Sequence, residues 1–150
     1  MTPGEVRARI LADHVAIRGM LLGLERVATR VGEGELSLVD ALRVDGEELL
    51  RRLLDHMRWE DLHLAPALRK ADAWGAERAA RLDGDHREQR QVLGHCLAAV
   101  QDRSRPATVV ARTLIDLVGM LREDIEEEER LLLDPRVLRD DVVGIDVETG

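Results

Sequence analysis

The chain contains no phenylalanine and no tyrosine, and only Trp59 and Trp74 among its 150 residues are tryptophan. Hydrophobic residues nevertheless make up 45% of the sequence, so any core must be built from Leu, Val, Ile, Ala and Met. Strands are enriched in aromatic and β-branched residues, and packed helices need neither. The composition therefore favours an all-α protein, and 150 residues suit one domain with a sizeable core.

Cysteine is nearly absent as well. Cys96 is the only one, which excludes an internal disulfide and suits the reducing cytoplasm. The first seven residues lack the apolar run of a signal peptide, and no stretch reaches the roughly 18–20 apolar residues of a membrane span. We expect a soluble, cytoplasmic protein with no membrane partner.

Positive charge is in deficit. The net charge is −8 and the sequence pI is about 5.1. A protein that grips nucleic acid needs a basic surface to neutralise phosphates. Nucleic acid is therefore not an expected partner.

Apolar residues recur at helical spacing in four segments. The first starts at the capping pattern of Thr2 and Pro3 and breaks at Gly32. The second starts near Ser37 or Asp40, and Pro66 is expected to kink or end it. The third runs from about residue 76 or 84 to 102, and the fourth from Pro106 to before residue 135.

Short connections between long helices predict an up-down-up-down four-helix bundle over residues 1–135. The acidic tail, residues 136–150, contains scattered valines. Three interpretations of the tail remain open, namely packing across the bundle, mediating a dimer, or staying loose. Whether the protein is a monomer or a homodimer is open for the same reason.

The most informative pattern is an internal repeat of titratable residues. His14 in the first segment corresponds to His86 in the third at an offset of 72 residues. His56 and Glu60 in the second segment correspond to Asp124 and Glu128 in the fourth at an offset of 68. This pattern indicates a duplicated helical hairpin with potential metal ligands at matching heights.

These residues interrupt otherwise apolar helix faces, where a buried carboxylate without a partner is costly. Residues four apart share one helix face, so His56 with Glu60, and Asp124 with Glu128, can each bind inward. Bundle cores build two-metal sites in this way. Nitrogen and oxygen donors without thiolate suit iron or manganese, with zinc as a further option.

The segments Leu11-Ala12-Asp13-His14, His56-Met57-Arg58-Trp59-Glu60-Asp61 and Asp85-His86 resemble the hemerythrin-like HHE cation-binding domain over about residues 5–135. The resemblance implies two iron ions with an oxo or hydroxo bridge, and O₂, peroxide or NO as small ligands. It also implies that Glu60 and Glu128 bridge the irons, that His14 and His56 bind one iron, and that His86 and Asp124 bind the other.

Two positions depart from the family's pattern. The family usually has His where this chain has Asp124, and oxygen-carrying hemerythrins have a second His where this chain has Arg90. Anionic oxygen donors favour the ferric state, so an oxidase, peroxidase-like or ferroxidase-like activity, with a small molecule as candidate substrate, is favoured over reversible oxygen carriage. Reversible binding of O₂ or NO, sensing of iron or oxygen, and a purely structural bundle are the alternatives.

Four neighbouring residues are further candidates for the site. Gln89 takes the place of the core residue Ile17 in the repeat, and could orient His86 or line a substrate pocket. Arg90 is either a solvated helix residue or a neutraliser of surplus carboxylate charge. His63 is a candidate alternative ligand, and Trp59 either covers the site or is a plain core or interface aromatic. Either of two acids beside Asp124 could replace it as a ligand, Glu123 or Glu127.

Overall fold

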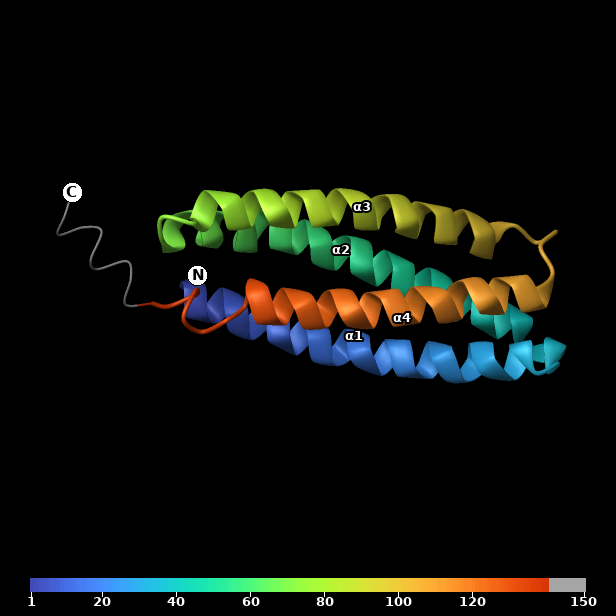
Figure 1. The fold of residues 1–150 in the computed structure, drawn as a ribbon. Helices are drawn as coiled ribbons and strands as arrows, with labels where there is room; N and C mark the ends of the chain where they lie inside the picture. The colour runs from blue at the N-terminus through green and yellow to red at the C-terminus, as the bar shows by residue number, and fades with distance from the viewer. Residues whose placement is uncertain (141–150) are drawn as a thin grey trace.

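The computed structural model describes residues 1–140, and over this range it consists of four α-helices and one 3₁₀ turn (Figure 1). The elements are α1 (Pro3–Gly32), η1 (Leu36–Leu38), α2 (Val39–Ala71), α3 (Gly75–Gln101) and α4 (Ala107–Leu131). Consecutive helices run antiparallel, which confirms the prediction of an all-α, up-down-up-down bundle.

The ends of α1 follow from local chemistry. The Thr2 hydroxyl accepts a hydrogen bond from the Glu5 backbone N–H at 3.1 Å, and the Glu5 carboxylate accepts one from the Thr2 N–H at 2.8 Å. This capping box pairs two backbone donors at the start of the helix. Beyond the other end, Gly34 adopts a φ of 109°, a conformation that glycine reaches without steric cost.

Helix α2 continues through Pro66 to Ala71, so the expectation that Pro66 could end this helix is wrong. The residues after the proline still contribute to the core, since Leu68 and Ala71 are buried. Packing of these side chains compensates for the backbone hydrogen bond that a proline cannot donate.

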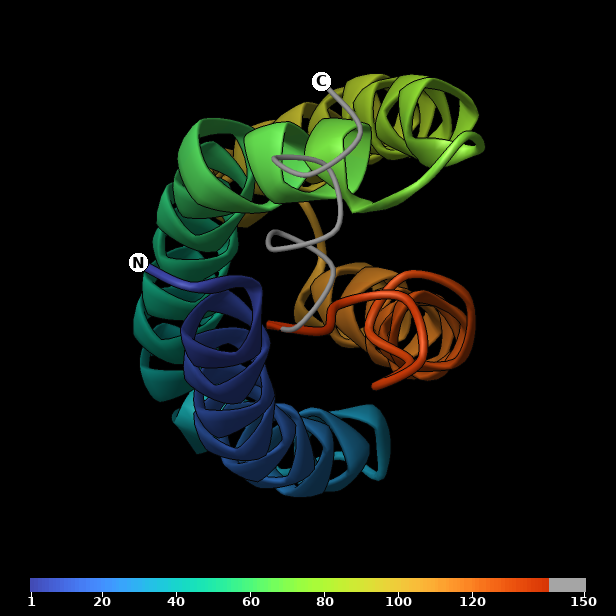
Figure 2. The same ribbon diagram turned by 90° about the vertical axis from the view of Figure 1, so that its left-hand side faces the viewer.

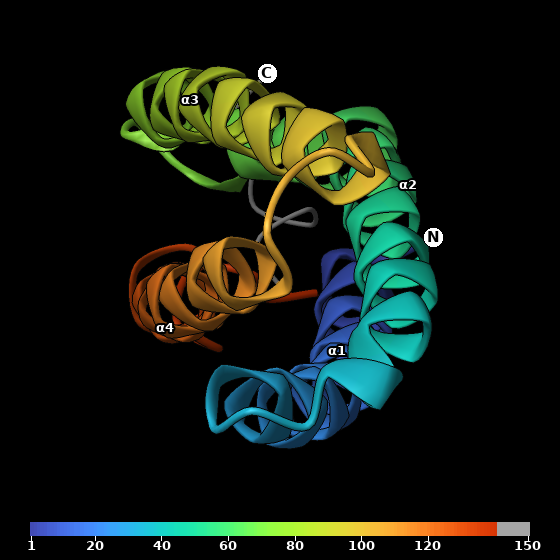
Figure 3. The ribbon, with the colours of Figure 1, turned by 90° about the vertical axis from the view of Figure 1, so that its right-hand side faces the viewer.

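Seen along the bundle axis, the helices follow one another in the order α3, α2, α1 and α4 (Figures 2 and 3). Helix α1 packs against both α2 and α4, and α2 packs against α3. Helices α3 and α4 make much sparser contact, so the bundle is less tightly closed along that side.

Two apolar clusters fill the interior, one on either side of a polar layer. The larger lies toward the end of the bundle where α1 passes into α2, and the smaller lies toward the chain's N-terminus. On α1, Ile10 belongs to the smaller cluster and Ile17 to the larger, and His14 lies between these two residues in the sequence. The same break occurs on α2, between Met57 and Leu64.

The chain after α4 folds back over the N-terminal end of the bundle as far as the description extends. Leu138 is buried in the smaller cluster, and the Asp140 carboxylate accepts a hydrogen bond from the Gly4 N–H at 2.7 Å. The first part of the expected tail therefore packs on the bundle, and residues 141–150 lie outside the described range. Within residues 1–140, no helix combines the length and the apolar character that crossing a membrane requires.

Candidate metal centre

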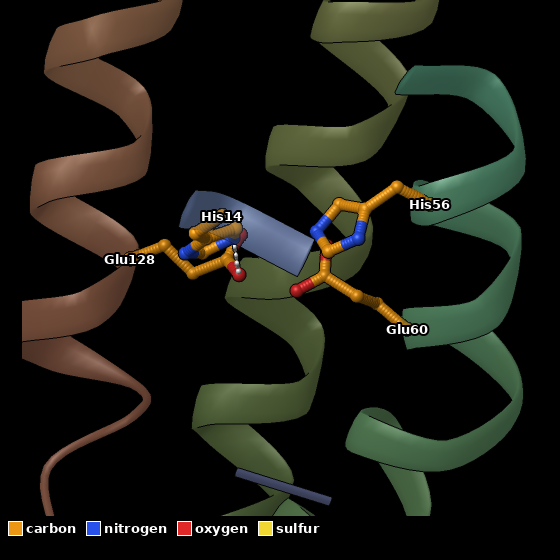
Figure 4. Close-up of side chains that lie close together, drawn as sticks. All are labelled: His14, His56, Glu60 and Glu128. Carbon is orange, nitrogen blue, oxygen red and sulfur yellow. Dashed lines mark ion pairs between the residues drawn. The ribbon is translucent and has the colours of Figure 1, made fainter. Parts of the chain in front are cut away.

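Three helices bring four of the predicted ligands together in the polar layer (Figure 4). His14 comes from α1, His56 and Glu60 from α2, and Glu128 from α4. One donor atom of each residue lies within 4.8 Å of the donor atoms of the other three. Such a group of nitrogen and oxygen donors can hold a metal ion.

The pairwise distances are those of donors that face one another. His14 Nε2 lies 3.4 Å from a Glu128 carboxylate oxygen, and His56 Nε2 lies 3.3 Å from a Glu60 oxygen. The rings of His14 and His56 have their centroids 5.1 Å apart. Four side chains from three helices thus converge on one point.

Three atoms of this group are buried without a hydrogen-bond partner among the described residues: His56 Nε2, one Glu60 oxygen and one Glu128 oxygen. The Glu60 and His14 side chains are only 1% exposed. Leaving such donors and acceptors unpaired is costly, and native structures rarely do so without a reason. A bound cation would pair them at once, so these residues fit a metal ion.

Burial also sets the protonation states. Burial, together with the negative charge of Glu128, raises the pKa of Glu60 well above its usual value. For Glu128 burial acts in the same sense, but interactions with the neighbouring Glu60, His14 and His56 outweigh it and lower its pKa to about 2. Burial lowers the pKa of His56, which keeps its imidazole neutral and its lone pair available. A cation bound here would favour the ionised form of both carboxyl groups.

His86 and Asp124 occupy the side of the layer nearer α3. His86 is buried, and its Nε2 lies 3.1 Å from the same Glu60 oxygen that faces His56. Asp124 is half-buried and accepts a hydrogen bond from the Gln89 side-chain amide at 3.2 Å. Burial raises the pKa of Asp124. Asp124 and Gln89 line an inner cavity of about 30 Å³ together with the four clustered residues.

Each of the three buried histidines has a carboxylate at its Nδ1 atom. Glu129 lies 3.2 Å from His14 Nδ1, Asp13 lies 3.3 Å from His56 Nδ1, and Asp61 lies 2.7 Å from His86 Nδ1. A carboxylate at Nδ1 favours the tautomer with the proton on that atom and leaves Nε2 free to bind a metal. Metal-binding histidines commonly have such partners.

Arginines hold these three carboxylates in turn. Arg18 pairs with Glu129 at 2.8 Å, and Arg52 lies 3.6 Å from Asp13. Arg90 pairs with Asp61, and its N–H donors lower the pKa of that carboxyl group although burial opposes the shift. Arg90 thus compensates a carboxylate that contacts His86.

Sequence reasoning missed the three supporting carboxylates. A signal for them existed, because Asp13 directly precedes His14, Asp61 directly follows Glu60, and Glu129 directly follows Glu128. Each acid contacts the histidine of a neighbouring helix, however, and not the ligand beside it in sequence. Knowing which helices are neighbours is needed to make that assignment.

Trp59 and His63 lie apart from the four clustered residues. Their rings stack with centroids 4.4 Å apart, and the Arg9 guanidinium lies 5.1 Å from the Trp59 ring. His63 is half-exposed, which differs from the inward position expected from its spacing to His56. Trp59 lines a hollow between α1 and α2 that reaches His56 from outside the layer.

Comparison with known proteins adds one finding. The family model described as the hemerythrin HHE cation binding domain matches residues 6–134, nearly the whole chain. Comparisons with curated proteins and with solved structures found no match.

Proposed function

Because the chain belongs to the hemerythrin HHE cation-binding domain family, we propose that it is a non-haem di-iron protein that reacts with O₂ or peroxide. The observation that carries the proposal is the set of three unpartnered donor atoms, on His56, Glu60 and Glu128, buried at one point. A structural bundle with no ligand would leave those atoms uncompensated.

In this proposal His14 and His56 bind one iron, and His86 and Asp124 bind the other. Glu60 is the natural bridging ligand, because a single oxygen of its carboxylate lies 3.3 Å from His56 Nε2 and 3.1 Å from His86 Nε2. Glu128, whose carboxylate lies 3.4 Å from His14 Nε2, would be the second bridging ligand. A pair of ferrous ions would supply the two electrons that reduce peroxide or begin the reduction of O₂.

The charge of the ligand set favours oxidase-like or peroxidase-like turnover. Three carboxylates and three imidazoles would surround two cations, whereas an oxygen carrier of this family uses more imidazole. Carboxylates stabilise the ferric state, which makes release of unreduced O₂ harder. Asp124 contributes one of these charges at the position where the family usually has histidine.

The size of the inner cavity supports a second candidate, non-catalytic binding of O₂ or NO in a carrier or sensor. About 30 Å³ holds a molecule or two of the size of water, and therefore a diatomic ligand or peroxide. In either function the centre would meet only small ligands directly, and an organic reductant would act from outside the cavity.

Exposing the reduced, iron-loaded protein to O₂ tests both candidates. Irreversible conversion to a ferric absorption spectrum, with continued O₂ consumption when reductant is added, is the expected result. A spectral change that reverses when O₂ is removed would favour the carrier or sensor. His56→Asn should abolish the response, and the matched control His95→Asn, at an exposed histidine on α3, should not. A wild-type protein that retains no iron would overturn both candidates.

A further inference from the structure

A groove runs between α3 and α4, the neighbouring helices that make the sparsest contact. Its volume is about 160 Å³. Charged residues of both helices form its outer part, and Val92, Met120 and Leu131 contribute apolar surface. The groove is therefore an opening onto the layer that holds the candidate centre.

The groove is strongly acidic. Arg81 is the only basic residue that lines it, and it is already engaged by carboxylates on both helices, Asp85 and Glu127. The groove is lined by five acidic residues in all, namely Asp85, Glu88, Asp124, Glu127 and Glu128. A concave surface with one sign of charge raises the local concentration of ions of the opposite sign. The groove therefore attracts cations.

The groove leads to an unpaired donor. Gln89, Asp124 and Glu128 line both the groove and the inner cavity, so the two spaces share a wall. Glu60 lines the inner cavity, its side chain is 1% exposed, and one of its oxygens has no partner among residues 1–140. A cation that passes this wall meets a buried carboxylate oxygen with nothing bound to it.

The shared wall is closed by one hydrogen bond across the helices, from the Gln89 amide to the Asp124 carboxylate. The inner cavity is too small for a divalent cation with its full hydration shell. Entry therefore requires the ion to lose water, and Asp124 can replace that water once it releases Gln89. The hydrogen bond is long at 3.2 Å, and both side chains are only half-buried, so water can replace either partner.

The other opening near the centre suits a cation poorly. It is the hollow between α1 and α2, of about 240 Å³, where Arg9 and Arg52 offset Asp13 and Asp55. It reaches His56 on the Nδ1 side, where Asp13 already occupies the ring nitrogen. A cation there would meet two guanidinium groups and no free donor of the centre.

We propose that the groove between α3 and α4 is the entry port for the divalent metal ion, and that the Gln89–Asp124 contact is its inner gate. The inference rests on the proposed function, because it requires a centre that binds metal. It adds to that function a route by which the metal ion enters, residues that attract the ion, and a residue that controls its passage. Asp85 and Glu88 attract the ion, and Gln89 controls its passage.

The port is tested by the rate at which Co²⁺, a coloured substitute for Fe²⁺, binds the metal-free full chain in a stopped-flow experiment. Asp85→Asn with Glu88→Gln should lower the association rate constant roughly three- to tenfold at low ionic strength, and the difference should shrink in high salt. The matched control is Asp45→Asn with Glu48→Gln, which removes the same charge at exposed positions of α2 outside the groove. Equal rates for the two double variants would overturn the port.

The gate is tested by Gln89→Ala in the same experiment. Loss of the hydrogen bond should raise the association rate constant at least about threefold without raising the dissociation constant, because the bond stabilises only the metal-free state. An unchanged association rate constant would overturn the gate, and so would a large rise in the dissociation constant, which would make Gln89 a ligand. A wild-type protein that binds no Co²⁺ would overturn the proposed function itself, so the two failures are distinguishable.

Discussion

At the scale of single residues, the centre depends on side chains that touch no metal. The carboxylates of Asp13, Asp61 and Glu129 each hold one histidine by its Nδ1 atom. Removing one of them should leave the bundle folded, because each lies at the border of the core. The histidine would then lose its fixed tautomer and ring orientation.

Asp61→Asn tests this dependence. An amide is a weaker acceptor for the His86 N–H and no longer pairs with Arg90, so metal affinity should fall by roughly 10- to 100-fold. Titration of the metal-free protein with Co²⁺ measures the change. Asp83→Asn is the control, since Asp83 pairs with Arg87 on the exposed face of α3. If the two variants bound Co²⁺ with equal affinity, Asp61 would have no role in positioning the metal ligand His86.

Glu60→Gln should have opposite effects on the metal-free and metal-loaded protein. Without metal the buried carboxylate is costly, so at neutral pH the variant should unfold with a free energy roughly 1–3 kcal/mol higher than the wild type. With metal the order should reverse, because the neutral amide binds a cation weakly. Chemical denaturation with and without Co²⁺ measures both, with exposed Glu48→Gln as the control.

The pH dependence of the metal-free protein has a definite sign. Burial and the negative charge of Glu128 raise the pKa of Glu60 in the fold well above its usual value of 4.5, so the proton is bound more tightly in the native state. The stability that this proton contributes is present below pH 4.5 and is lost as the pH rises toward the raised pKa. Between pH 5 and 7 the wild type should therefore lose stability relative to Glu60→Gln. If the stabilities of the wild type and Glu60→Gln changed in parallel between pH 5 and 7, the raised pKa of Glu60 would be contradicted.

At the scale of elements, the turn between α2 and α3 determines how His86 is placed against Glu60. Gly75 begins α3, and a Cβ atom there would collide with the Leu68 carbonyl oxygen and lie 2.9 Å from the Arg69 carbonyl carbon. These are backbone atoms at the end of α2, which no change of rotamer can move. The close approach of the two helices therefore requires glycine.

Gly75→Ala should lower the free energy of unfolding by roughly 2–4 kcal/mol and weaken metal binding, because α3 must shift relative to α2. Gly84→Ala and Gly94→Ala are matched controls in the same helix, since both sites are exposed and a Cβ would meet nothing within 4 Å. Each control should raise stability by roughly 0.5–1 kcal/mol. Urea denaturation measures the three free energies of unfolding. If Gly75→Ala were as stable as the two controls, the close approach of α2 and α3 at Gly75 would be contradicted.

At the scale of the whole molecule, the polar layer divides the core into two apolar clusters. Without metal this layer contains buried donor atoms without a partner and a buried carboxyl group, Glu60, whose pKa is raised, so it destabilises the metal-free fold. A metal ion bound there links three helices at one point. Metal and fold should therefore be strongly coupled.

Removing metal with a chelator should lower the unfolding temperature, and adding it back should restore stability. At a free metal concentration 100 times the dissociation constant, one site contributes about 2.7 kcal/mol. Calorimetry over a series of Co²⁺ concentrations measures this dependence. An unfolding temperature that does not change with metal would contradict the coupling.

The sequence predicted the four helices and the layer of candidate ligands because both depend on local spacing. Helical periodicity placed His14, His56 and His86 on inward faces, and all three are buried. Two features depend instead on tertiary contact. Pro66 does not end its helix, because burial of the following turn outweighs the backbone hydrogen bond that the proline cannot donate. The side chain of Asp124 is held by Gln89, a partner on another helix that spacing does not reveal.

The most direct test of the central claim is the iron content of the chain after anaerobic loading with Fe²⁺ and removal of unbound metal. We expect two iron ions per chain in the wild type, and a large loss of iron in His56→Asn but not in His95→Asn. A wild-type protein with no bound iron would contradict the metal centre as a whole. A single iron per chain would contradict the assignment of His86 and Asp124 to a second metal.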